Sequence, residues 1–511
     1  MWELINNPSD HPLANIKSAR ELLDSLPKED TAKLLQEIAY WVESVTVPEN
    51  KFRLSHQLAV LRLLDDTAHP YLSNAVNEYF AVPAPSAFRS NSMWVTLNEY
   101  YSRVGHAYLS VLRSCLEAKK RSSAITLHLP LVTARGIYAL AGKLKLAAAR
   151  YAVVEPEVWS DMSEFYAFAE AKKYLNEPLT LYDEFTAGKS IQALFAGTLI
   201  WQACCSGSLS PLQIHIAERV ITSLGNHLTL DAQYFSGSML AFDLRHAIPP
   251  MRLNGESTLR HGLRFIGVGD APQHLDDLLG LLEKGGIPEP LALSKGYTVE
   301  TVLEVVRHLA QHVSSSPPLR RNPRREVCVN LCVANGFSRL HELAAAHTAS
   351  ISAAGERWLT KDISANGFLC ILPSERANRM KIGELVGLQP EKIDRWGAGI
   401  VRRMSRDAQN NLLVGVEMLS NQLVGVLLHE HLNAASDIGG QRALYLNKPG
   451  DDSGEAWLLM KPEFFSAKRS LSMSMDEQQY LLTPLELMQQ GEDYTVARYR
   501  KMEQAASSNS A

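Results

Sequence analysis

Apolar residues recur at helical spacing through the first part of the chain. Asp30 or Thr31 can cap a helix whose apolar face runs from residue 34 to residue 45. Residues 58–64 carry apolar side chains without strand-like alternation and favour a buried helix. The pattern therefore predicts an all-α region over residues 1–228, with no convincing fixed-period repeat. The apolar positions of the first helix are Leu34, Leu35, Ile38, Trp41, Val42 and Val45.

The pattern becomes mixed between residues 229 and 316. Asp270 and Pro272 are typical of a helix start, and Gly285-Gly286 is typical of a helix end. The stretch Ser314–Pro318 that follows, Ser-Ser-Ser-Pro-Pro, predicts a linker. Strands are expected at 235–244 and 263–268, and helices at 270–285 and 298–313.

Strand-like patterns dominate from residue 327 onward. Leu471, Met473 and Met475 alternate with polar residues, which is the period of a half-buried strand. We expect one β-rich domain over residues 317–425 and a second, small one over residues 426–511, with the hypothesis that the strands near 235–268 complete the second. The fold class is multidomain α+β with an all-α N-terminal region. The strand-like runs of the first β-rich domain are 327–333, 368–372, 382–388, 399–403 and 413–418.

Composition excludes several classes of function. A chain of 511 residues is long enough for several domains. The formal net charge of −4 argues against general nucleic-acid binding. The N-terminus has neither a basic nor an apolar leader segment, and the longest apolar stretch, 191–205, is too short to cross a bilayer. None of the six cysteines forms a CxxC pair. We expect a cytoplasmic protein without a membrane span, with free thiols and with no metal or cofactor.

The candidate chemistry lies in two short motifs. The first is the arginine cluster Arg320–Arg325, Arg-Arg-Asn-Pro-Arg-Arg, which leads into a strand-like run. Arginine binds phosphate through a planar fork of donors and can also bind the O6/N7 edge of guanine. The second is Asp362–Gly367, Asp-Ile-Ser-Ala-Asn-Gly, which offers an acceptor, a hydroxyl and a close backbone approach. Together these groups suit a ligand that carries both phosphates and purines.

The two motifs, in this order and with strand-like runs after them, resemble the PilZ family of cyclic-di-GMP receptors. The family pattern is R-x-x-x-R, a strand, and then [DN]-x-S-x-x-G. The resemblance covers roughly residues 317–425 and implies a PilZ-like antiparallel β-barrel with cyclic-di-GMP as its ligand. The segment Gly336–His347 lengthens the gap between the motifs and predicts a short helical insertion.

The register of the arginine motif has two solutions. Arg320 and Arg324 have the family spacing, and so do Arg321 and Arg325. We favour the first pair because the family often has proline just before its second arginine, as Pro323 is here. By the resemblance, Arg320 and Arg324 would hold a phosphate and a guanine, and Arg321 would stack on a base or contact the second phosphate. The alternative is a solvated, charged linker.

The second motif supplies the remaining predicted contacts. By the resemblance, Asp362 would accept from guanine N–H groups, Ser364 would hydrogen-bond the ligand, and Gly367 would let the strand turn close to it. The alternative is a simple β-turn, because Asp, Ser and Gly are all turn residues.

Catalytic and metal motifs do not reach the required spacing. His341 and His347 are six residues apart, whereas a zincin helix needs histidines at i and i+4. No GGDEF-like or EAL-like signature is present, so the chain is not expected to make or degrade the nucleotide. A catalytic role for the helical region would fall on His106, Glu164 or Asp183 as acid or base, and nothing in their spacing supports it.

The sequence therefore predicts a bacterial, non-catalytic cyclic-di-GMP effector. Binding at the barrel would couple to domain reorientation or to partner binding, and the helical region would contact a protein partner or self-associate. The alternative is a scaffold protein whose PilZ-like barrel no longer binds nucleotide.

Overall fold

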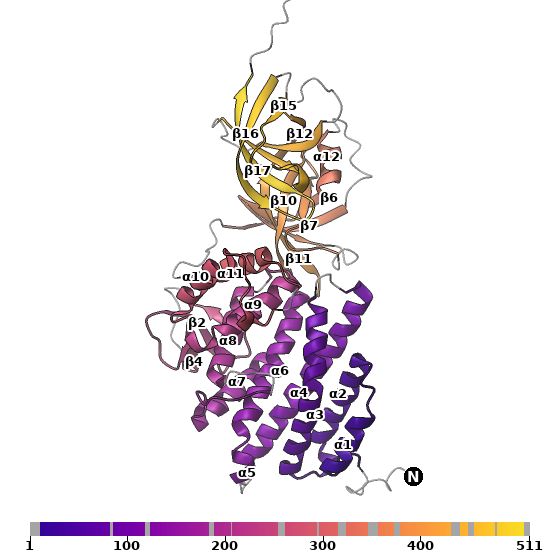
Figure 1. Ribbon diagram of the computed structural model, residues 1–511, viewed down its shortest axis with the longest axis vertical. Helices are drawn as coiled ribbons and strands as arrows, with labels where there is room; N and C mark the ends of the chain where they lie inside the picture. The colour runs from indigo at the N-terminus through magenta and orange to yellow at the C-terminus, as the bar shows by residue number, and fades with distance from the viewer. Residues whose placement is uncertain are drawn as a thin grey trace, which may run out of the picture. The chain divides into compact units, whose positions relative to one another are not determined.

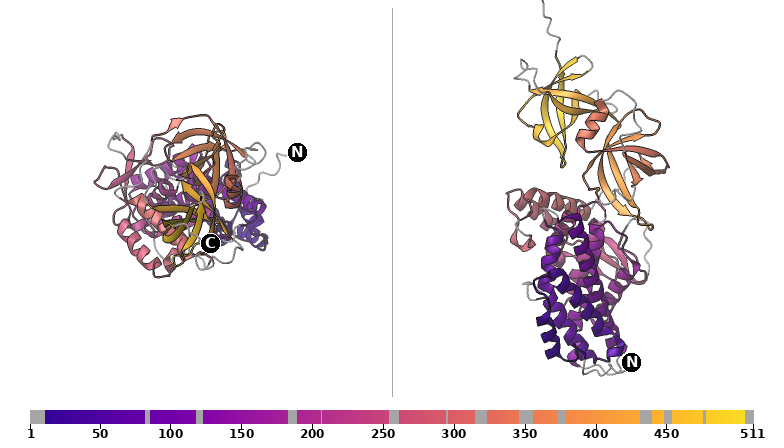
Figure 2. Two further views of the ribbon diagram at one scale, coloured as in Figure 1. Left: turned by 90° about the horizontal axis from the view of Figure 1, so that it is seen from above. Right: turned by 90° about the vertical axis from the view of Figure 1, so that its right-hand side faces the viewer.

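The computed structural model divides the chain into two compact units, residues 1–318 and 319–511, which are described separately (Figures 1 and 2). The structure describes residues 11–81, 85–117, 123–182, 189–205, 207–253, 261–293, 296–314, 323–345, 356–372, 379–430, 440–447, 454–475 and 478–504.

The first unit is built on a bundle of long helices, in which α2, α3, α4 and α6 run side by side (Figure 1). Asp30 caps α2 by accepting from the backbone N–H of Lys33, as the sequence predicts. Ser210 and Gln213 form a reciprocal capping box at the start of α9. The helices are α1 (Ile16–Ser25), α2 (Thr31–Thr46), α3 (Leu54–Tyr79), α4 (Ala87–Glu117), α5 (Ser123–Thr126), α6 (Leu129–Ala149), α7 (Pro156–Lys172), α8 (Ile191–Cys205) and α9 (Pro211–Ser223), with short 3-10 turns η2 (Pro48–Asn50) and η3 (Gly225–His227).

A small sheet and two helices complete this unit. The sheet has the order β1-β4-β2-β3, and α10 packs against α11, which in turn packs against α9. Apolar side chains of both helices, among them Leu275 and Val306, belong to the same core as the bundle. The elements are β1 (Thr229–Asp231), β2 (Ser238–Asp243), β3 (Met251–Arg252), β4 (Leu263–Gly267), α10 (Ala271–Leu282), η4 (Glu289–Leu291) and α11 (Val299–Val313).

The second unit begins with a closed antiparallel barrel. Its sheet has the order β5-β7-β6-β9-β10-β11-β8, and a further pairing between β7 and β8 closes the ring. The expected helical insertion is α12 (Phe337–Ala345), which follows β6. The strands are β5 (Arg325–Glu326), β6 (Asn330–Asn335), β7 (Glu356–Ser364), β8 (Gly367–Ile371), β9 (Leu385–Pro390), β10 (Gly397–Arg406) and β11 (Leu412–Ser420).

A second closed barrel follows after a single residue, Asn421. Its strand order is β12-β13-β14-β17-β16-β15, and Leu471 and Met473 are buried inside it, as their alternation predicts. The strands near 235–268 form their own sheet, so the prediction that they complete this domain is wrong. The elements are β12 (Gln422–Glu430), β13 (Gln441–Asn447), β14 (Glu455–Met460), η7 (Pro462–Phe464), β15 (Leu471–Met475), β16 (Gln478–Gln490) and β17 (Thr495–Glu503).

Helix α12 contacts strands of both barrels (Figure 2). Phe337 and Leu340 of this helix share one apolar cluster with Leu385 of the first barrel and Leu444 of the second. The backbone N–H of Phe337 also donates to Asp493 at 2.7 Å. The insertion is therefore part of the packing between the barrels. The predicted multidomain α+β fold class is confirmed, and the expected second β-rich domain is itself a closed barrel. None of the described helices is long and apolar enough to cross a bilayer.

Candidate functional site

The structure brings Arg324 and Asp362 into direct contact, although 38 residues separate them. Arg324 precedes β5, and β5 pairs with β7 so that Glu326 lies opposite Asp362. This pairing places the Arg324 Nη1 atom 3.0 Å from Asp362 Oδ2. The second half of the predicted arginine motif and the predicted carboxylate are thus parts of one site. Arg320 and Arg321 lie outside the residues that the structure describes.

One oxygen of Asp362 accepts no hydrogen bond from the residues that the structure describes. Its side chain is 15% exposed, and its Oδ1 atom is buried without a hydrogen-bond partner among the described residues. Burying a carboxylate oxygen without a partner is unfavourable. A ligand N–H group would satisfy this atom. The orphaned oxygen is therefore an observation that points to a ligand at Asp362.

A β-bulge sets the direction of the Asp362 side chain. Thr360 lies opposite Cys370 and Asp362 opposite Leu369, so Lys361 is the extra residue in β7. Bulges are found where a side chain must be redirected next to a functional site. The neighbouring residue Ile363 lines the interior of the barrel. Because successive side chains of a strand alternate, Asp362 lies on the outer face.

Ser364 and Gly367 form the turn of the β7–β8 hairpin, where they pair with each other. The Ser364 hydroxyl donates to the Gly367 carbonyl at 3.3 Å. A Cβ atom at Gly367 would lie 2.2 Å from the carbonyl oxygen of Val416, so strand β11 requires glycine here. The packing within the barrel explains Gly367 without a ligand, and the predicted ligand contacts of Ser364 and Gly367 stay predictions.

Arg403 is a further candidate for the site. Asp362 lies opposite Leu369, Leu369 opposite Gly415, and Gly415 opposite Arg403. Residues that pair across strands lie on the same face of a sheet. Three strand spacings separate Asp362 from the exposed Arg403, about 14 Å along the surface. Only the strand pairing of the folded barrel reveals this row.

A separate pocket of about 570 Å³ lies at the first barrel and is also lined by Gln422 and Asn447 of the second barrel. All six strands of the closed ring contribute to its lining, and Ile363 and Phe368 are the lining residues next to the site motif. Among the described residues that line it, Arg395 is the only one with a formal charge. This apolar space does not suit two phosphates, and it lies on the opposite face of β7 from Asp362.

The two described acid–base candidates of the helical region, His106 and Glu164, contact different partners. Arg113 holds Glu164 through two hydrogen bonds of 2.9 and 2.6 Å. His106 faces Asp161 instead, with Nε2 3.7 Å from Oδ2. Burial raises the pKa of the Asp161 carboxyl. Asp183 lies outside the described residues.

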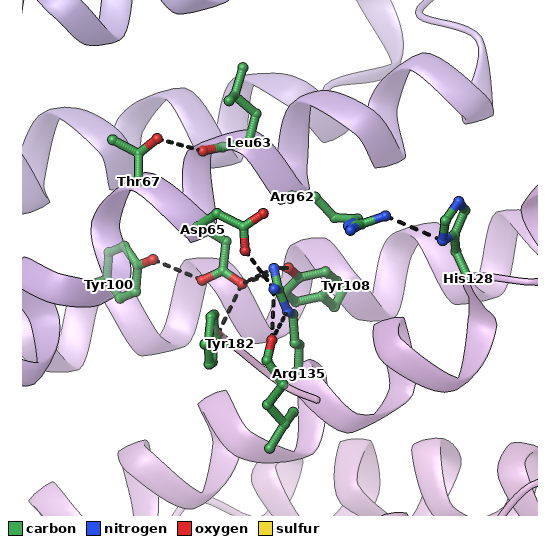
Figure 3. Close-up of polar contacts among 11 residues, drawn as sticks. Arg62, Leu63, Asp65, Thr67, Tyr100, Tyr108, His128, Arg135 and Tyr182 are labelled. Atoms are coloured by element: carbon green, nitrogen blue, oxygen red, sulfur yellow. Dashed lines mark hydrogen bonds and ion pairs between the residues drawn. The ribbon is translucent and has the colours of Figure 1, made fainter. Parts of the chain in front are cut away.

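A buried polar network fixes the helical bundle (Figure 3). Asp65 on α3 accepts hydrogen bonds from Tyr100, Tyr108 and Tyr182 at 3.0, 2.6 and 3.0 Å and from the Arg135 guanidinium at 3.2 Å. Burial raises the pKa of Asp65, and Arg135 and the three hydroxyls oppose that shift. Both Asp65 oxygens have partners. The network is a structural centre rather than an open site, and the spacing of its members in the sequence gave no sign of it.

Comparison with known families concerns the helical unit. Residues 17–233 match the family model described as "Cyclic-di-GMP receptor FimW, N-terminal domain". The match spans α1 to β1, less than half of the chain, and it ends before the barrels. It supports a cyclic-di-GMP receptor, and it does not identify the first barrel as a PilZ domain. A search of curated proteins finds no matching relative.

Proposed function

We propose that this protein is a non-catalytic cyclic-di-GMP effector that binds the nucleotide on the outer face of the first barrel, in the manner of PilZ domains. The observation that carries the proposal is the contact between Arg324 and Asp362, whose Oδ1 atom has no partner among the described residues. The similarity of residues 17–233 to the N-terminal domain of a cyclic-di-GMP receptor supports the same ligand from an independent part of the chain.

The geometry suits the two kinds of group in cyclic-di-GMP. The guanine N1–H and N2–H groups are donors, and the free Asp362 Oδ1 atom is an acceptor next to the donors of Arg324. Arginine can also bind the guanine O6/N7 edge or a phosphate. Leu369 and Gly415 lie between Asp362 and Arg403, and Gly415 has no side chain. A flat base can lie there.

Cyclic-di-GMP carries two negative charges, so its binding needs Arg320 and Arg321 in addition to Arg324. Glu326 is exposed and lies opposite Asp362, so two carboxylates flank Arg324. One guanidinium beside two carboxylates is a poor site for a dianion. We therefore assign the phosphates to Arg320 and Arg321, with Arg324 facing a guanine. Because these residues lie where the two units are joined, ligand binding would restrict that connection and so affect domain orientation or partner binding.

Titration calorimetry of the full chain with cyclic-di-GMP tests the proposal. We expect a dissociation constant of about 1 µM or below, which corresponds to about −8 kcal/mol. Arg324→Ala and Asp362→Ala should each weaken binding by about tenfold or more, since charged hydrogen bonds contribute about 1.5–3 kcal/mol. Arg357→Ala is the matched control, because Arg357 is exposed on the same strand but outside the site.

The outcomes separate the proposals. Absence of binding at high protein concentration would exclude the effector function and favour a scaffold protein. That alternative has one observation in its favour, which is that Arg324 and Asp362 already neutralise each other. Binding that neither variant weakens would retain the ligand but move the site elsewhere, with Arg321 and Arg325 and the helical unit as the next places to test.

A further inference from the structure

Three side chains in the first unit meet as a cluster of two imidazoles and one carboxylate. His227 ends η3, Asp270 immediately precedes α10, and His274 lies in the first turns of α10. The Nδ1 atom of His227 lies 2.9 Å from Asp270 Oδ1, and the Nε2 atom of His274 lies 3.5 Å from Asp270 Oδ2. The two imidazole rings are 3.7 Å apart between centroids. All three ligand-type atoms lie within 4.8 Å of one another.

The backbone holds these residues together independently of their side chains. Thr229 pairs with Gly267 in the β1–β4 ladder, which fixes the segments that carry His227 and Asp270. Gly269 has a φ of +49°, and a Cβ atom there would lie 2.3 Å from the carbonyl oxygen of His227. Only glycine permits so close an approach. Asp270 and His274 are four residues apart and therefore lie on one face of the helix.

We propose that His227, Asp270 and His274 bind a divalent transition metal ion of the zinc class. Imidazole and carboxylate are common ligands of such ions, and bond lengths of about 2.0–2.2 Å place neighbouring ligand atoms of a tetrahedron about 3.3 Å apart. The separations of 2.9 Å to Asp270 Oδ1 and 3.5 Å to Asp270 Oδ2 are close to that value, and one ligand atom from each residue lies within 4.8 Å of the other two. Small rotations of the side chains would bring all three atoms onto one ion.

The surroundings define what kind of site this is. The side chains of His227, Asp270 and His274 are 31, 64 and 42% exposed, so water can occupy the remaining coordination position. Two nitrogen ligands favour zinc, nickel or copper over magnesium or calcium, which prefer oxygen. The positive end of the α10 dipole opposes a cation, and the Asp270 carboxylate must offset it. We therefore expect affinity in the micromolar range and a strong dependence on Asp270.

Such an ion would join two parts of the first unit. His227 belongs to the stretch that matches the receptor family, whereas Asp270 and His274 lie beyond its end at residue 233. Metal binding would fasten α10 to the end of the bundle. The sequence gives no sign of this cluster, because His227 lies 43 residues from Asp270 and the pairing of β1 with β4 brings them together.

Zinc titration of the full chain, without a histidine tag and after treatment with a chelator, tests this site. We expect saturable binding of Zn²⁺. Loss of a residue that supports a metal ligand typically weakens metal binding by about 10–100-fold. Loss of a ligand itself should weaken it further, and we expect this for His227→Ala, Asp270→Asn and His274→Ala. His246→Ala is the matched control, because His246 is exposed and contacts the single carboxylate of Asp243 at 2.8 Å. This control should bind zinc like the unchanged protein.

Substitution with Co²⁺ identifies the ligands by a second route. Nitrogen and oxygen ligands in a tetrahedron give visible absorption bands without the near-ultraviolet charge-transfer band of a cobalt–thiolate bond. Circular dichroism of each variant without metal shows whether it remains folded. The proposal is overturned if no zinc binds at micromolar concentration, if thiolate bands dominate, or if the folded His227 and His274 variants retain full affinity.

Discussion

Replacing Asp65 with Asn should strongly destabilise the helical unit. The Arg135 guanidinium is almost completely buried, with 4% of its side chain exposed, and Asp65 is its buried countercharge. Asn would keep the size of the side chain and remove the charge. It would also replace one carboxylate oxygen, a hydrogen-bond acceptor, with an NH₂ group, which is a donor. The hydroxyl groups that now donate to Asp65 belong to Tyr100, Tyr108 and Tyr182.

The contacts that Arg135 keeps after Asp65→Asn determine how much unfolding free energy is lost. Breaking a buried ion pair by removing one partner typically costs about 3–5 kcal/mol. Arg135 would keep Asp66, which is 49% exposed, and the backbone carbonyl of Leu181 at 2.7 Å. These contacts place the expected loss of unfolding free energy at the lower end, about 3 kcal/mol. Tyr100→Phe removes one hydrogen bond to a charged group and should cost about 1.5 kcal/mol.

Urea denaturation followed by hydrogen–deuterium exchange of peptides from α3, α4 and α6 measures this loss in the helical unit alone. The local readout is needed because two compact units need not unfold in one transition. A loss below about 1 kcal/mol for Asp65→Asn would refute the reasoning. It would mean that the Asp65 carboxyl is already protonated in the folded protein and that Asp66 alone balances Arg135.

Three further predictions concern the barrel surface and the pH dependence of stability. Gly367→Ala should lower the melting temperature of the second unit and weaken cyclic-di-GMP binding, because its Cβ would lie 2.2 Å from the Val416 carbonyl oxygen; unchanged calorimetric and thermal data would contradict this. Arg403→Ala should weaken binding of cyclic-di-GMP while leaving the melting temperature within a few degrees, and calorimetry with equal affinities would remove Arg403 from the site. Burial lowers the pKa of His308 to about 4, although its Nε2–H donates to a backbone carbonyl. Because the unfolded value is about 6.5, the neutral folded form contributes stability above pH 6.5 that is lost as the pH falls, by up to about 2 kcal/mol at pH 5. Urea midpoints from pH 7 to 5 should show this slope, and His308→Gln should reduce it.

Local sequence patterns predicted where helices and strands lie, whereas they did not predict which strands pair with one another. Asp30 begins α2 as expected, and the alternation of Leu471 and Met473 corresponds to a buried strand face. The partner of a strand is not a local property, which is why the strands near 235–268 were placed in the wrong sheet. The same limit applies to Arg403, whose position relative to Asp362 depends on three successive strand pairings.

The two motifs, Arg320–Arg325 and Asp362–Gly367, could be found in the sequence because each is a short segment. The way in which their side chains meet could not be predicted. Arg324 and Asp362 meet through the β5–β7 pairing, and the bulge at Lys361 has no clear signal in the sequence. The burial of Asp362 Oδ1 without a partner in the described part of the chain is a property of the fold, and the sequence carries no sign of it. Buried networks such as Asp65 with Arg135 were missed for a related reason, since their members come from separate helices.

The contact between Arg324 and Asp362 does not prevent ligand binding on energetic grounds. Arg324 is 30% exposed, and ion pairs near the surface typically contribute only about 0–1 kcal/mol. A guanine that donates to Asp362 and accepts from Arg324 can form charged hydrogen bonds that contribute about 1.5–3 kcal/mol each. The ligand can also donate to Asp362 Oδ1, which has no partner within the described ranges, without displacing Arg324. The existing pair therefore holds both side chains in place before binding, which lowers the entropy lost when the nucleotide binds.

On this argument, Arg324→Ala should weaken binding by more than the loss of the direct contact between Arg324 and the nucleotide, because it also releases the side chain of Asp362. A double-mutant cycle with Asp362→Ala should then show coupling, and strictly additive losses would mean that the two residues act separately.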